Sequence, residues 1–116
     1  MGIESIFMNH IRTDEKSRNV LIHPIVLKAS IKVARKRLSE YFNSNNYFNV
    51  DYNEEYNELY TEQYPYEITC YLSQNEATTV VNILFYNIDG KRKRRDFIGL
   101  LENLRENLSD ILDSNN

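Results

Sequence analysis

Apolar residues recur with a helical period near both ends of the chain and with a strand period between them. Between residues 24 and 43 an apolar side chain falls at every third or fourth position, and Pro24 suits a first helical position, where an N–H would lack a partner. The same period returns at 96–113, where Asp96 can cap the first turn. These patterns predict two amphipathic helices, at 24–43 and 96–113.

The segment between these helices carries strand signals. Side chains in 66–73 alternate between apolar and polar, which is typical of a half-buried strand. Residues 78–88 are apolar on both faces, which predicts either a central strand or one that meets a partner. Asp89-Gly90 then favours a type I′ hairpin turn, because that turn needs positive φ at both central residues. We therefore expect a third strand after it and a three-stranded antiparallel meander at about 66–95.

A tyrosine-rich acidic stretch precedes the meander. Asp51 with Glu54 three residues later resembles a capping box, and tyrosines beyond Asp51 recur at helical spacing. The pattern predicts a short Tyr-rich helix at 51–62. Near the N-terminus the apolar residues of 3–12 fit either a short helix or a strand that runs into a turn, and the conformation of 1–22 stays open.

The predicted fold is therefore a small single α+β domain, in which the meander packs against three helices over residues 1–116. A chain of 116 residues is near the usual size for one hydrophobic core. The lone Cys70 excludes an internal disulfide and a cysteine-based zinc site. Without a secretory signal or an apolar run of the roughly 20 residues that a membrane helix needs, we expect a cytoplasmic protein with no membrane contact. The many Asn, Ile and Tyr residues have AT-rich codons, which favours a low-GC bacterium or a mobile element.

Charge falls in blocks beneath a formal net charge of -3. Residues 28–37 hold five basic side chains and no acidic one, whereas 51–67 hold six acidic side chains and no basic one. Residues 91–95 are all basic. Such blocks give opposite signs to different surfaces of one molecule and can steer association.

The acidic block is the first candidate site, a protein–protein interface. Tyrosine gives a large contact area with little loss of entropy and is enriched in interface cores. The predicted contact residues are Tyr52, Tyr56, Tyr60, Glu55 and Glu58. Two alternatives stay open: the tyrosines pack on the sheet with their hydroxyls in water, or the acidic face mimics a nucleic acid.

The basic blocks are the second candidate site, because cations that displace counterions can hold a nucleic-acid backbone. The residues of this alternative are Lys91, Arg92, Lys93, Arg94 and Arg95, with Lys28, Lys32, Arg35 and Lys36 on the first helix. A charged edge strand and the solvated side of a helix explain the same pattern without a ligand. The pI near 5.4 also opposes a dedicated nucleic-acid domain.

Catalytic, metal and cofactor sites are not expected. Cys70 shares the apolar side of its strand, His23 precedes a predicted helix start, and no glycine-rich phosphate loop is present. We therefore expect a non-enzymatic regulatory or inhibitory binding protein with a protein partner, and nucleic acid as the alternative ligand. The two-faced strand at 78–88 also permits a homodimer.

Overall fold

The structure, a computed structural model, describes residues 10–90 and 94–113. Within these residues the chain forms one six-stranded antiparallel sheet, two α-helices and two short 3-10 helices. The elements in chain order are β1 His10–Arg12, η1 Val20–Ile22, β2 Ile25–Leu27, α2 Ile31–Ser44, β3 Phe48–Asn53, β4 Glu58–Gln63, β5 Tyr66–Asn75, β6 Thr78–Asn87, α3 Arg94–Asn107 and η2 Ser109–Ile111.

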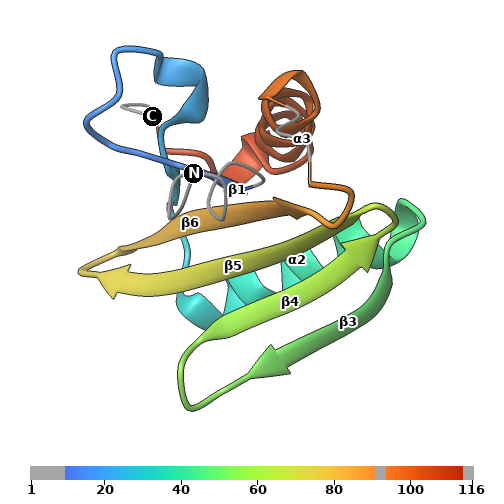
Figure 1. The fold of residues 1–116 in the computed structure, drawn as a ribbon. Helices are drawn as coiled ribbons and strands as arrows, with labels where there is room; N and C mark the ends of the chain where they lie inside the picture. Colours follow the sequence, from blue (N-terminus) through green and yellow to red (C-terminus); the bar gives the residue numbers. More distant parts are fainter. Residues whose placement is uncertain (1–9, 91–93, 114–116) are drawn as a thin grey trace.

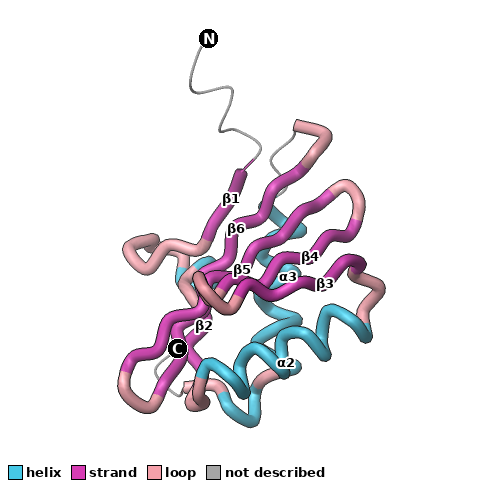
Figure 2. The backbone as a smooth tube through the Cα atoms, turned by 90° about the horizontal axis from the view of Figure 1, so that it is seen from below, coloured by secondary structure: helices cyan, strands magenta, loops and turns pink. Residues whose placement is uncertain are grey.

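Strand β6 is the centre of the sheet. The strand order is β1-β6-β5-β4-β3, and β2 also pairs with β6 (Figures 1 and 2). On that side β1 pairs with one end of β6 and β2 with the other, so that Ile11 lies opposite Phe85 and Val26 opposite Val80. Thr13 continues the pairing after β1: the Ile83 N–H donates to its hydroxyl at 3.0 Å. Both backbone edges of β6 are therefore occupied.

Both α-helices pack on the same face of the sheet. In Figure 1 α2 lies behind β4 and β5, and in Figure 2 α3 lies behind the strands while α2 runs alongside β3. Alternate strand residues point toward them and are fully or almost fully buried: Leu59, Ile68, Cys70, Leu72, Val81, Ile83 and Phe85. The helices contribute Ala34, Leu38, Tyr41, Phe42, Phe97, Leu100, Leu101 and Leu104 to the same core. The other face of the sheet receives no helix from the described residues.

The predicted helix at 24–43 begins later than expected. Residues 25–27 form β2 against β6, and α2 starts at Ile31, where the Ser30 hydroxyl accepts a hydrogen bond from the Val33 N–H at 3.3 Å. The apolar stripe therefore combines a strand with a helix. The N-cap serine, and not Pro24, marks the start, because the serine satisfies an N–H that the helix leaves open.

The predicted Tyr-rich helix at 51–62 is wrong, because this stretch forms most of the β3–β4 hairpin. The Asn53 side-chain oxygen accepts hydrogen bonds from the N–H groups of Glu55 and Tyr56, and Asn57 adopts a positive φ of 53°. Asparagine suits a turn because its side chain can accept hydrogen bonds from nearby backbone N–H groups and because it tolerates a positive φ. The capping-box pattern at Asp51 is thus a coincidence of spacing.

The three-stranded meander is also wrong, because the sheet has six strands. Four of them, β1 to β4, come from segments that the sequence pattern predicts as helices or leaves open. Strands β5 and β6 confirm the hairpin predicted from 66–73 and 78–88. No strand can follow Gly90 along β6, since β1 and β2 already hold that edge. Gly90 has a φ of 80°, and the next described residue, Arg94, begins α3. The helix predicted at 96–113 is present as α3, which begins two residues earlier and ends at Asn107, and the short η2 follows it.

Among the described residues no helix is both long and apolar enough to span a membrane.

We predict that Leu104→Ala lowers the free energy of unfolding by about 2–5 kcal/mol, because Leu104 is fully buried beneath the sheet and the change leaves a cavity. Chemical denaturation measures this loss. Glu102→Ala, an exposed position on the same helix, is the control and should change the value by less than about 0.5 kcal/mol. A loss below about 1 kcal/mol for Leu104→Ala would show that α3 does not pack on the sheet.

A candidate protein-binding face

The sheet face opposite the helices carries a set of exposed and half-buried side chains, which we call the open face. Its residues alternate with the buried ones along each strand, as the pleat requires. They are His10, Arg12, Val26, Asp51, Glu58, Tyr60, Glu62, Glu67, Thr69, Tyr71, Ser73, Val80, Asn82, Leu84 and Tyr86.

Aromatic rings are spread over the open face from strand to strand. Tyr60 on β4 lies opposite Thr69, which lies opposite Leu84 on β6. Tyr71, 40% exposed, occupies the next position on β5 between Asn82 and Glu58. At the other end of the strands Tyr86 packs its ring on His10, with ring centroids 4.6 Å apart. Strands β4, β5 and β6 therefore each present a tyrosine ring on the open face.

Acidic side chains outnumber basic ones on this face. Asp51, Glu58, Glu62 and Glu67 lie on β3, β4 and β5, whereas the described strands contribute only Arg12 as a permanent cation. The negative charge is concentrated around Tyr60, because Asp51 is paired with it across the hairpin and Glu58 and Glu62 are two residues away on the same strand. The open face therefore combines tyrosine rings with an excess of acidic side chains.

Glu62 is held in place by two neighbours. The Tyr60 hydroxyl donates to Glu62 Oε2 at 2.8 Å, and the Asn49 side chain donates to Glu62 Oε1 at 2.9 Å. Partial burial, the hydrogen bond to Glu62 and the negative charge of Glu67 and Glu62 together raise the pKa of Tyr60 to about 12. This tyrosine is therefore a neutral hydrogen-bond donor at every physiological pH.

Glu67 lies directly across from Glu62 in the β4–β5 ladder. Like charges in opposed positions destabilise a pair of strands. Within residues 10–90 and 94–113, the side chain of Glu67 makes neither a hydrogen bond nor an ion pair, although the residue is half-buried. The side chain of Glu67 thus lies across from a like charge and makes no ion pair among the described residues.

A hollow of about 210 Å³ lies beside this carboxylate on the open face. Its lining combines two rings, an aliphatic side chain, a hydroxyl and the carboxylate: His10, Tyr86, Leu84, Thr69 and Glu67. A larger groove of about 620 Å³ runs along β1 and shares His10 and Leu84 with the hollow. On its β1 side the open face therefore contains a hollow and a groove rather than a flat surface.

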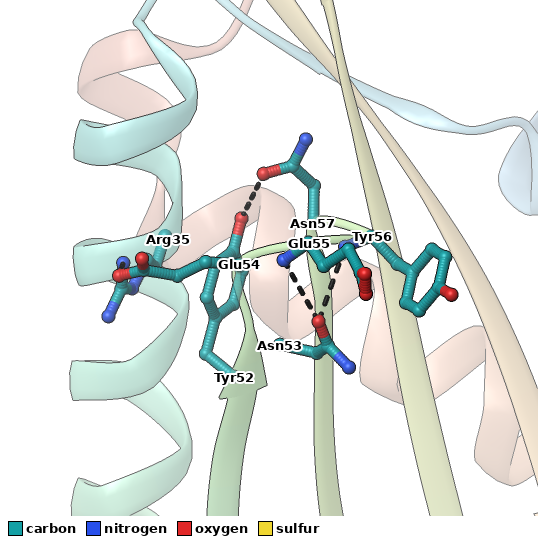
Figure 3. Close-up of polar contacts among 7 residues, drawn as sticks. All are labelled: Arg35, Tyr52, Asn53, Glu54, Glu55, Tyr56 and Asn57. Carbon is teal, nitrogen blue, oxygen red and sulfur yellow. Dashed lines mark hydrogen bonds and ion pairs between the residues drawn. The ribbon is translucent and has the colours of Figure 1, made fainter.

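The structure separates the five residues predicted for the protein interface. Tyr60 and Glu58 lie on the open face, while Glu55 and the 65% exposed Tyr56 lie in the β3–β4 turn. Tyr52 points to the helix side of the sheet, where its ring lies under the Arg35 guanidinium at 4.2 Å and its hydroxyl donates to Asn57 Oδ1 at 2.9 Å (Figure 3). The three tyrosines therefore do not form one stripe.

The residues predicted for nucleic acid are also divided. Lys91, Arg92 and Lys93 lie outside the described residues, and Arg94 and Arg95 are the first residues of α3 rather than part of a strand. Lys28, Lys32 and Lys36 are exposed around the start of α2, whereas Arg35 is paired with Glu54 at 2.9 Å.

These basic groups lie at opposite ends of the central hairpin. Near the turn of the β5–β6 hairpin, the Ile31 N–H donates to Gln74. At the open end of the hairpin, the Tyr66 hydroxyl donates to Asp96 in the first turn of α3. Roughly 25 Å of strand β6 lies between the two ends. The start of α2 and the start of α3 therefore do not form one continuous basic patch.

Other reactive groups are committed to the fold. Cys70 is fully buried, and burial raises the pKa of its thiol to about 12. His23 contacts the Ser17 carbonyl through Nε2 at 2.7 Å, and Arg105 donates to the carbonyls of Leu21 and His23. In the part of the chain that the structure describes, no three His, Cys, Asp or Glu side chains are grouped to hold a metal ion.

Sequence reasoning missed most of the open face, although a signal was present. The alternation of 66–73 already puts Glu67, Thr69 and Tyr71 on one side of a strand, and the same rule puts Leu84 and Tyr86 together on β6. A helix at 51–62 would not place Tyr60 and Glu58 on that side of the sheet. The site becomes visible only when β4 is placed beside β5.

Comparison with protein-family models, with curated proteins and with solved structures gives no match for this chain.

We predict that the Tyr60 phenol ionises near pH 12 instead of near the ordinary value of about 10. Because the folded-state pKa is raised, the stability that Tyr60 contributes is complete below about pH 10 and is lost as the pH rises toward 12. Ultraviolet titration of the wild type minus Tyr60→Phe isolates this phenol. Glu62→Gln should lower its pKa, and a Tyr60 phenol that ionises near 10 in the wild type would contradict the Glu62 contact.

We also predict that Glu67→Gln raises the free energy of unfolding by about 0.2–1 kcal/mol, since it removes the charge that opposes Glu62 across the ladder. Urea denaturation at low salt measures this gain. Glu55→Gln, in the exposed β3–β4 turn, removes a charge with no such neighbour and should leave the stability within about 0.3 kcal/mol of the wild type. A loss of stability in Glu67→Gln would mean that Glu67 supports the fold.

Proposed function

We propose that this protein is a non-enzymatic regulatory or inhibitory binding protein whose open face docks a basic surface of a protein partner. One observation carries the proposal: tyrosine rings and four carboxylates share a sheet face that neither helix covers. Rings in the middle of such a face supply contact area, and charges around them set the orientation and the rate of association. The lone Cys70, which needs no oxidising environment, fits a cytoplasmic location.

The face, and not the sheet edge, is the proposed contact. The outer edge strand β3 has a bulge between Phe48 and Asp51, where Asn49 adopts a positive φ of 54°. Bulges interrupt the regular ladder that a partner strand would need, and they protect sheet edges against pairing. Side-chain contacts to the open face therefore suit the partner better than added backbone pairing does.

The nucleic-acid alternative has weaker support. A phosphate backbone needs several cations within one footprint. The exposed lysines around the start of α2 and the arginines at the start of α3 are separated by the length of the central hairpin, and Arg35 is occupied by Glu54. The acidic face would in addition repel phosphates.

A selection from a phage-displayed library of random peptides tests the proposal, because it does not require the natural partner. Peptides are selected on the wild type, and those that still bind Glu58→Lys/Tyr71→Ala are removed. We expect the remaining peptides to be rich in Arg and Lys, and their synthetic forms to bind this variant at least tenfold more weakly in calorimetry.

The matched control changes the opposite side of the molecule. Lys32→Ala/Lys36→Ala alters two exposed side chains on α2 and should leave the affinity within about twofold. Peptides without an excess of basic residues, or equal binding to the wild type and the open-face variant, would refute the proposal. Salt-sensitive binding of duplex DNA that is lost in Lys32→Ala/Lys36→Ala would favour the nucleic-acid alternative instead.

A further inference from the structure

The hollow beside Glu67 has the chemistry of a socket for one cationic side chain. Its carboxylate has no cationic partner among the described residues, and a tyrosine ring and an aliphatic side chain stand next to it. At about 210 Å³ it is smaller than the roughly 300–1,000 Å³ of pockets that hold drug-sized ligands. It has room for a side chain rather than for a whole small molecule.

The same chain already shows how such groups hold a guanidinium. On the helix side of the sheet, Arg35 lies over the Tyr52 ring at 4.2 Å while its Nη1 contacts Glu54 Oε1 at 2.9 Å (Figure 3). The ring attracts the cation through its negative face, and the carboxylate neutralises it. Tyr86 and Glu67 on the open face repeat the ring and the carboxylate; His10 packs on the Tyr86 ring, and no arginine of the described residues lines the hollow.

We infer that the hollow lined by Glu67 and Tyr86 receives one arginine side chain of the basic partner and anchors it on the open face. This inference rests on the proposed function and names the residue type that the face selects. Glu67 pairs with the guanidinium, the Tyr86 ring stacks on it, and Leu84 contacts the methylene stem. The socket also explains why a carboxylate that opposes Glu62 is kept in the ladder.

Arginine fits these groups better than lysine does. The guanidinium is planar, stacks on aromatic rings and can give two parallel hydrogen bonds to one carboxylate, whereas the lysine ammonium is a strongly hydrated point charge. A partner residue that only neutralised the acidic face would not show this preference. The preference for arginine therefore separates a socket from general charge attraction.

Three capped tripeptides provide the probes: Gly-Arg-Gly, Gly-Lys-Gly and the neutral analogue Gly-citrulline-Gly. Each is titrated into the isotopically labelled protein at constant ionic strength and followed by NMR. We expect Gly-Arg-Gly to shift the signals of Glu67, Thr69, Leu84 and Tyr86 with saturation. The lysine peptide should bind several-fold more weakly, and the citrulline peptide at least tenfold more weakly.

Variants of the hollow are compared with a matched carboxylate outside it. Glu67→Gln should weaken Gly-Arg-Gly about tenfold and Tyr86→Leu about fivefold, because each removes one of the two groups that hold the guanidinium. Tyr86→Phe keeps the ring and should stay within about twofold. Glu106→Gln removes a negative charge from an exposed position on α3, outside both the hollow and the open face, and should also stay within about twofold.

Equal weakening by Glu106→Gln and Glu67→Gln, or equal affinity for the arginine and lysine peptides, would overturn the socket. The absence of saturable shifts around the hollow would do the same. The peptide selection is a separate measurement. If it still yields basic peptides that depend on the open face, the proposed function stands even though the socket fails. If the selection yields no basic peptide that depends on the open face, the proposed function itself fails.

Discussion

The double pairing of β6 is the constraint on which the rest of the structure depends. One side of this strand is bonded to β5 along its whole length, and the other side is shared by β1 and β2. Because both edges are filled, no further strand can pair with β6, and the next residues that the structure describes after Gly90 form α3. The same pairing fixes which side chains of β6 face the helices, and it thereby separates the core from the open face.

The distribution of cations completes the character of the open face. Arg37 makes a two-pronged contact with Asp110 at 2.9 Å, and this contact raises the pKa of the guanidinium and lowers that of the carboxyl. Arg105 of α3 is half-buried against η1, where it donates to the carbonyls of Leu21 and His23, and burial lowers the pKa of its guanidinium. Arg37 and Arg105 are thus held on the helix side, while among the described residues the carboxylates of β4 and β5 make no ion pair.

The sequence predicts the parts of this fold that depend on local pattern. The β5–β6 hairpin, the burial of Cys70 and the apolar stripe of α3 all follow from periodicity. The β3–β4 hairpin does not, because tyrosines at 52, 56 and 60 satisfy a helical spacing and a strand equally well, and only pairing with β5 decides between them. The residues of the open face could not be predicted for the same reason. They come from strands that are distant in sequence, and only the pairing of those strands brings them together.

The alternation along β6 divides its residues into two sets with different duties. The odd-numbered positions from Thr79 to Asn87 are buried, and the even-numbered positions from Val80 to Tyr86 belong to the open face. Changes in the second set leave the packing beneath the helices untouched. A protein built in this way can keep its scaffold while the side chains of its open face vary from one generation to the next.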